Sequence, residues 1–193
     1  MVMAKREKWM DLTKGIEGDL KHFGTLTDRE LVIIGAATID AGLAHLIEKR
    51  LVQNKGRITK FLNLDGSSAM SPAGGFSARI QLAYLTGILA EAEYTAIDSI
   101  RRMRNIAAHQ VNISLQDNEI EILMDKVTVW VIAVLRGGLS GQEKNSVVQW
   151  HDKIKAVPAA YAKTMLVYAF ALFNTVSANK DKIIKPIKKI GET

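Results

Sequence analysis

The sequence predicts an all-α protein, folded as a single helical bundle. Apolar residues recur at spacings of three and four along most of the 193 residues, which is the period of an amphipathic helix. Helix-starting and helix-stopping residues separate these periodic stretches. With 48% hydrophobic and 24% charged residues, the chain has an ordinary globular composition and is long enough to bury one sizeable core.

The first two expected helices lie in the N-terminal quarter of the chain. Residues 2–22 predict an amphipathic arm, with apolar positions at Trp9, Leu12, Ile16 and Leu20. The second helix starts after Thr27, whose hydroxyl and the carboxylate of Glu30 have the spacing of a capping box, and it runs to about Val52. Asp40 is a polar residue close to its apolar side. We expect that apolar side to hold Leu31, Ile34, Ala37, Ala41 and Ala44.

The middle of the chain predicts one long loop followed by two helices. Residues Asn54 to Gly75 favour a loop with at most a short turn around Ile58 to Leu62. The residues that indicate the loop are Asn63, Asp65, Gly66, Pro72, Gly74 and Gly75. Helix is expected to resume at Phe76 or Ser77 and to run to about Leu89. A further helix is expected from Ala92 to about His109, with an apolar stripe of Tyr94, Ile97, Ile100 and Met103.

Three more helices are expected after residue 113. Ser114 or Asp117 can cap the first of them, which Gly137-Gly138 stops. Its segment from Val127 to Leu135 is rich in Val and Ile, as strands are, but the apolar run is continuous and the sequence offers no partner strand, so we interpret it as a buried helix. A polar helix follows over about 142–155. Pro158 then opens the last long helix.

The last helix contains the longest apolar run of the chain. Residues 164–178 hold about a dozen apolar side chains interrupted by Asn174, whereas a membrane-spanning helix needs about 20. We therefore expect a buried or subunit-contact helix and no membrane span. The predicted organisation is an arm over 1–24, a core bundle over 25–137, and C-terminal helices with a basic tail over 138–193. The lysines of that tail, expected to be solvated, are Lys180, Lys182, Lys185, Lys188 and Lys189.

Composition and charge exclude several classes of protein. The chain has no cysteine, so it has no disulfide framework, zinc knuckle or thiol nucleophile. Three of its histidines, His22, His45 and His151, are scattered, and neither a metal site nor another cofactor is predicted. A net charge of +6 permits contact with nucleic acid or an acidic partner. The first fourteen residues mix charges of both signs without the apolar stretch of a secretory signal, which indicates a cytoplasmic protein.

The residues best suited to chemistry are those of the string Arg104-Asn105-Ile106-Ala107-Ala108-His109. Histidine shuttles protons near neutral pH, because its ordinary pKa is about 6.5. The planar guanidinium of arginine suits the charge of a phosphate. This pairing is typical of metal-independent RNA cleavage. Arg101 and Arg102 lie just upstream and make the local field basic.

Two neighbouring signatures carry a family resemblance. The stretch Gly75-Phe76-Ser77-Ala78-Arg79-Ile80-Gln81-Leu82-Ala83-Tyr84, followed by 101–109, resembles the mannitol operon repressor family. The string Ala36-Ala37-Thr38-Ile39-Asp40 is similar to that family's first core helix. The resemblance covers about residues 28–125 and implies a non-enzymatic regulatory module that acts through protein contacts in a homo-oligomer, most simply a homodimer. The sequence offers no obvious basic recognition helix for direct DNA binding.

The Arg-Asn-x-x-x-His string also resembles the hallmark of the HEPN superfamily of helical bundles. That resemblance implies an alternative, a metal-independent endoribonuclease, in which Arg104 and His109 are the catalytic pair and Asn105 is the polar residue between them. The strongest nuclease branches carry an aromatic residue two positions after the histidine, where this chain has Val111. RNA binding without turnover is a third alternative, with Arg101, Arg102 and Arg79 as the expected nucleic-acid contacts.

Helix geometry sets a condition on catalysis. At about 100° per residue, Arg104 and His109 lie about 140° apart on one helix, whereas Asn105 and His109 share a face. Either His109 lies at a frayed helix end or two copies of the string meet across a dimer axis. In a structural role, Arg104 and Asn105 would instead bond to the opposite helix. We also expect Asp40 to pair with Arg79 or Arg104 and to fix how the central helices cross.

Overall fold

The computed structural model of the chain describes residues 21, 23–51, 54–67, 70–137 and 141–187. These residues form α-helices and no strand, which confirms the all-α prediction. The arm predicted over 2–22 lies, apart from Lys21, outside the described residues. The helices are α2 (Asp28–Arg50), α3 (Lys55–Leu62), α4 (Phe76–Leu85), α5 (Glu91–His109), α6 (Asn118–Gly137), α7 (Gly141–Lys155) and α8 (Pro158–Ile183).

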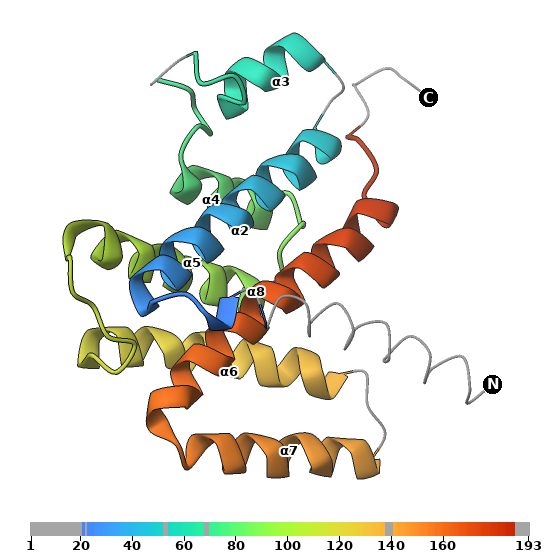
Figure 1. Cartoon of the computed structure of the whole chain (residues 1–193). Coiled ribbons are helices and arrows are strands. Elements are labelled where there is room, and N and C mark those ends of the chain that lie inside the picture. The colour runs from blue at the N-terminus through green and yellow to red at the C-terminus, as the bar shows by residue number, and fades with distance from the viewer. Residues whose placement is uncertain (1–20, 22, 52–53, 68–69, 138–140, 188–193) are drawn as a thin grey trace.

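The helices pack in pairs around one core. In Figure 1, α2 and α8 run side by side in the same direction, and α5 and α6 form an antiparallel hairpin that lies across them. α4 packs on α2 and α5, and α7 returns along α6 before the chain enters α8. The helices α2, α4, α5, α6 and α8 all contribute side chains to the same buried apolar cluster. α8 is therefore part of the core on which the α5–α6 hairpin rests.

The close approach of α2 and α8 depends on two glycines. A Cβ atom added to Gly35 would lie 2.0 Å from two ring atoms of Phe170, and one added to Gly42 would lie 2.8 Å from the ring of Phe173. The glycines are seven residues apart, which places both on the side of α2 that faces α8. Phe170 is 1% exposed, so its ring fills the space that a side chain at Gly35 would need.

The buried side of α2 differs from the expected one. Ile34 is 40% exposed, and Ala37 and Ala41 are also exposed, whereas Leu31 and Ala44 are buried as expected. The helix is apolar around most of its circumference, so periodicity alone does not select the face that the neighbouring helices cover. The side chains and glycine that face the core are Leu31, Val32, Gly35, Ala36, Ile39, Leu43, Ala44, Leu46 and Ile47.

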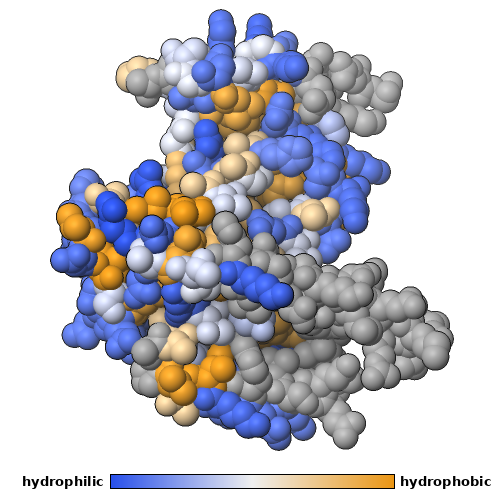
Figure 2. Space-filling view, viewed as in Figure 1, coloured by the Kyte–Doolittle hydropathy of each residue, from blue (hydrophilic) through white to orange (hydrophobic). Residues whose placement is uncertain are grey.

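One described helix, α2, is long and apolar enough to span a membrane by length and composition alone. Half of the residues in its most apolar window are buried inside the bundle, and core helices of this kind meet the same criterion. Figure 2 shows that the described residues on the visible face carry their apolar side chains in separate patches among hydrophilic ones. The apolar run of α8 is likewise buried from Met165 to Phe173, except for the half-buried Tyr168.

The stretch predicted as a loop contains the helix α3. The side chain of Asn54 accepts a hydrogen bond from the amide of Arg57 and caps its start. Ile58 and Leu62, four residues apart, are buried, and Asn63 ends the helix in the left-handed conformation at φ 53°. A second difference lies in α4, which ends at Leu85 and not near Leu89, because the chain turns there through Gly87 at φ +72°.

The basic C-terminal segment is not uniformly solvated. Lys180 donates to the backbone carbonyl of Ile88 and forms an ion pair with Glu93, both at 2.6 Å. Its side chain is 22% exposed, so it belongs to the contact between α8 and the start of α5. Lys188 and Lys189 lie outside the described residues.

Candidate functional site

The candidate site lies on the C-terminal half of α5. The helix starts at Glu91, and the carboxylate of Glu93 accepts a hydrogen bond of 2.8 Å from the amide of Ala90. One side of the helix is buried through Ala96, Ile97, Ser99, Ile100, Met103 and Ala107. The polar residues of the motif occupy the opposite side, because the apolar stripe and the polar residues alternate at the helical period.

The polar residues of the motif face outward. Arg102, Arg104, Asn105 and His109 are exposed, and Arg101 is half-buried. Arg104 Nη1 donates to Asn105 Oδ1 at 3.3 Å, which is the one hydrogen bond of these two side chains among the described residues. The structural role, in which Arg104 and Asn105 bond to an opposite helix, therefore finds no support in this geometry.

Arg101 has a partner on its own helix. Its Nε donates to Asp98 Oδ1 at 2.8 Å, one turn earlier. The Asp98 side chain is 32% exposed, so the pair lies at the surface and contributes little to stability. It does fix the Asp98 carboxylate on the same outer side as the motif.

The first turn of α2 anchors the end of α5. Arg29 Nε donates to the carbonyl oxygens of Ala107 at 2.9 Å and of Gln110 at 3.2 Å, which are among the carbonyls left unpaired at a helix C-terminus. Asp28 Oδ2 accepts from the amide of Leu115 at 3.0 Å. The positive charge of Arg29 already complements the α5 dipole. His109 is therefore not required for that purpose.

Arg79 is buried in the protein and does not contribute to the motif on α5. Its Nε and Nη2 donate to the carbonyl oxygens of Ala73 at 3.1 Å and Leu62 at 2.7 Å. Its Nη1 lies 2.9 Å from Asp40 Oδ1, in an ion-pair contact that is not aligned as a hydrogen bond. Of the two partners expected for Asp40, the structure thus brings in Arg79 and not Arg104. Since the Arg79 side chain is only 10% exposed, it is not available to nucleic acid, contrary to expectation.

A single copy does not assemble a catalytic pair. Arg104 and His109 both lie on the exposed side of α5, but at its two edges, as expected from their separation of about 140°. Asn105 lies between them, four residues before His109. Within the described residues, no group of three or more His, Cys, Asp or Glu side chains is arranged to hold a metal ion. In the described part of the chain, the motif forms a basic, hydrogen-bonding helix face.

The comparisons with known proteins leave the class of protein open. Family models, curated proteins and solved structures give no match to this chain. What the fold and site define by themselves is an all-α bundle with an exposed arginine, asparagine and histidine face. Sequence reasoning missed Arg29 and the pair of His151 and Tyr161, whose Nε2 and hydroxyl lie 2.8 Å apart. Both depend on contacts between separate helices and have no local motif.

Proposed function

We propose that the protein is a non-enzymatic regulatory module, similar to the mannitol operon repressor family within the HEPN-type bundles, that acts in the cytoplasm as a homodimer. The observation that supports this proposal is the exposure of Arg102, Asn105 and His109. Fold stability does not require a polar helix face that contacts nothing else in the described chain. Such an exposed face is accessible to a partner.

The charge pattern of α5 favours a second copy of the chain as that partner. Glu91, Asp98, Arg102, Asn105 and His109 follow one another at spacings of seven, four, three and four, and so form one stripe along the helix. We call these five residues the α5 stripe. Its N-terminal half is acidic and its C-terminal half is basic.

An antiparallel pairing of two α5 stripes matches opposite charges. A two-fold axis on the exposed side of α5, at the level of position 100 along the helix, sets Asp98 of each copy opposite Arg102 of the other, and Glu91 opposite His109. Each contact then occurs twice, as an isologous interface requires. A parallel pairing would instead set like charges against each other.

The test is the association of the purified chain. Sedimentation velocity over a range of concentrations is expected to show a monomer–dimer equilibrium, and Arg102→Asp is expected to weaken it by about tenfold or more because two ion pairs become two repulsions. Arg136→Asp, an exposed arginine on α6, is the matched control and should leave association unchanged. A wild-type chain that stays monomeric, or equal effects of the two variants, would contradict the proposal.

A second candidate function is metal-independent endoribonuclease activity. The exposure of Arg104, Asn105 and His109 together, with no acidic partner for Arg104 among the described residues, favours it. His109 would serve as general acid and base and Arg104 as the phosphate clamp. Because these residues diverge on α5, the reaction would need both copies of a dimer that brings two motifs together.

This alternative is distinguished by an RNA-cleavage assay. The nuclease predicts cleavage at neutral pH that persists in EDTA and is lost in His109→Ala. The regulatory module predicts that varied RNA substrates stay intact. Binding of RNA without cleavage would appear as a complex whose affinity falls steeply with salt and falls further in Arg102→Ala.

A further inference from the structure

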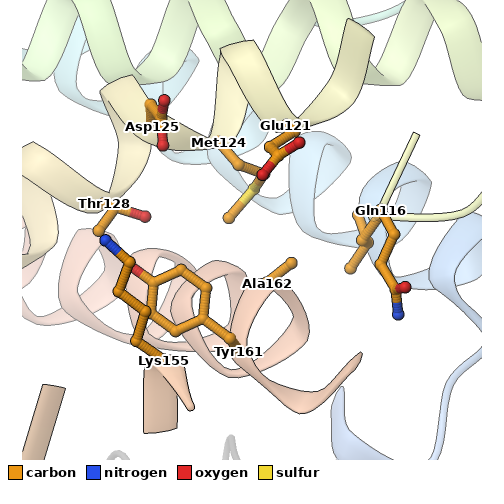
Figure 3. Close-up of a pocket in the computed structure, with 9 residues that line it drawn as sticks. Gln116, Glu121, Met124, Asp125, Thr128, Lys155, Tyr161 and Ala162 are labelled. Carbon is orange, nitrogen blue, oxygen red and sulfur yellow. The ribbon is translucent and has the colours of Figure 1, made fainter. Parts of the chain in front are cut away.

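A cavity lies between α6, the end of α7 and the start of α8, away from the outer face of α5. Its volume is about 560 Å³, within the range of small-molecule sites. Side chains from four consecutive parts of the chain line it, and Figure 3 shows them converging on a common space. They include Leu115 and Gln116 of the connector that follows His109.

The floor of the cavity holds a buried hydroxyl without a hydrogen bond. Thr128 is 9% exposed, and its Oγ1 is buried with no hydrogen-bond partner among the described residues. In Figure 3 this oxygen points into the cavity. The Thr128 hydroxyl lies close enough to Tyr161 to lower the pKa of that phenol without forming a well-aligned hydrogen bond, so it retains hydrogen-bonding capacity for a molecule in the cavity.

Tyr161 forms the neighbouring wall and is held in place. Its hydroxyl lies 2.8 Å from His151 Nε2, and the two rings meet edge to face at 5.6 Å. Burial raises the pKa of Tyr161; the Thr128 hydroxyl opposes this rise and the negative charge of Asp125 adds to it. The phenol is therefore neutral at pH 7 and is a hydrogen-bonding group of the cavity.

Charged side chains of both signs surround this floor. Glu121 and Asp125, one turn apart on α6, supply two carboxylates, and Lys155 supplies one ammonium group. Figure 3 shows Lys155 beside Tyr161 and Thr128, with Glu121 toward the other end of the cavity. Met124 lies between these ends and provides an apolar contact. These three charged side chains give the lining a net charge of −1, and the ammonium group of Lys155 lies at one end of the cavity.

We propose that this cavity binds a free cationic amino acid. The carboxylate of such a ligand would bind Lys155 and accept from the Thr128 hydroxyl, and its two cationic groups would bind Asp125 and Glu121. The ligand's net charge of +1 complements the lining, and its aliphatic chain matches Met124. This site is independent of the function proposed for α5.

The test uses L-lysine and L-arginine as probes and the methyl group of Met124 as the reporter. In ¹³C-methyl NMR spectra of the full chain, the Met124 signal is expected to shift and saturate by about 10 mM probe. The signal of Met103, which is buried in α5, should stay in place. L-Glutamate should cause no saturable shift, and putrescine, which lacks a carboxylate, should bind at least about tenfold more weakly than L-lysine.

Matched variants assign the contacts. Asp125→Asn and Thr128→Val are each expected to weaken probe binding by about tenfold or more, while Glu119→Gln, an exposed position of α6 outside the cavity, should not change it. Unfolding curves of every variant report whether the fold is intact. The proposal is overturned if no saturation occurs by about 10 mM, if L-glutamate binds equally well, or if Asp125→Asn and Glu119→Gln behave alike in folded protein.

Discussion

Gly35→Ala tests the packing of α2 on α8 on which the whole bundle depends. The new methyl group would lie 2.0 Å from Cε2 and Cζ of Phe170, whereas carbon atoms in contact are about 3.5–4.0 Å apart. The ring must therefore retreat by about 1.5 Å or more. It has little room, since Phe170 is 1% exposed and packs on the ring of Phe23 at 5.6 Å.

Two opposing effects set the magnitude. Overpacking a core costs about 1–3 kcal/mol, and driving a phenyl ring out of its site costs about 3–5 kcal/mol. Replacing a helical glycine by alanine returns about 1 kcal/mol of helix propensity. We expect Gly35→Ala to lower the free energy of unfolding by about 2–4 kcal/mol. For a chain of this length, that loss corresponds to a decrease in Tm of roughly 4–16 °C.

The assay is urea denaturation followed by circular dichroism at equilibrium. Gly56→Ala in α3 is the matched control, because an added Cβ there meets nothing within 4 Å, and it should be neutral or slightly stabilising. In a Phe170→Val background, Gly35→Ala should cost nothing further, since the clashing ring atoms are gone. A Gly35→Ala protein as stable as the wild type would refute the close approach of α2 and α8.

Three other perturbations test the anchoring contacts. Arg79→Met should lower the free energy of unfolding by about 2–4 kcal/mol, because buried carbonyl groups lose their donors; a loss below about 1 kcal/mol in urea denaturation would contradict the inferred role. Arg29→Ala should cost about 1 kcal/mol and accelerate hydrogen exchange at the end of α5, and unchanged exchange there would count against the anchor. The raised pKa of Tyr161 predicts that its contribution to stability is complete below pH 10 and is lost as pH rises through the folded-state pKa. Tyr161→Phe should therefore reduce the loss of stability above pH 10, and identical alkaline unfolding curves would exclude this linkage.

Local sequence signals predicted the elements well where capping residues and periodicity agree. The capping box of Thr27 and Glu30 is present at the start of α2, and Pro158 is the first residue of α8. The helix α3 was missed because its eight residues contain one buried turn, Ile58 to Leu62, within a segment rich in loop-forming residues. Its position also depends on Arg79, whose donors reach the carbonyl of Leu62 from the next helix.

Contacts between distant segments determine the features that the sequence alone does not predict. The buried side of α2 follows Gly35 and Gly42, where α8 approaches, and no periodicity distinguishes that side in a helix apolar all round. The motif from Arg104 to His109 was found from its residues alone. Its exposure depends on how α2 and α6 cover the other side of α5, and the cavity beside Tyr161 depends on three helices meeting.

The most direct test of the proposed function is a charge-exchange experiment on the α5 stripe. Asp98→Lys and Arg102→Asp each place like charges opposite one another in an antiparallel homodimer. Each variant alone is therefore expected to sediment as a monomer at a concentration where the wild-type chain is largely dimeric. In an equimolar mixture, the lysine introduced into one chain would face the aspartate introduced into the other. The unchanged Arg102 of the first chain would likewise face the unchanged Asp98 of the second. Two ion pairs are thereby restored. The mixture is expected to sediment as a heterodimer. A mixture that remains monomeric, or single variants that dimerise as the wild type does, would contradict the proposed interface.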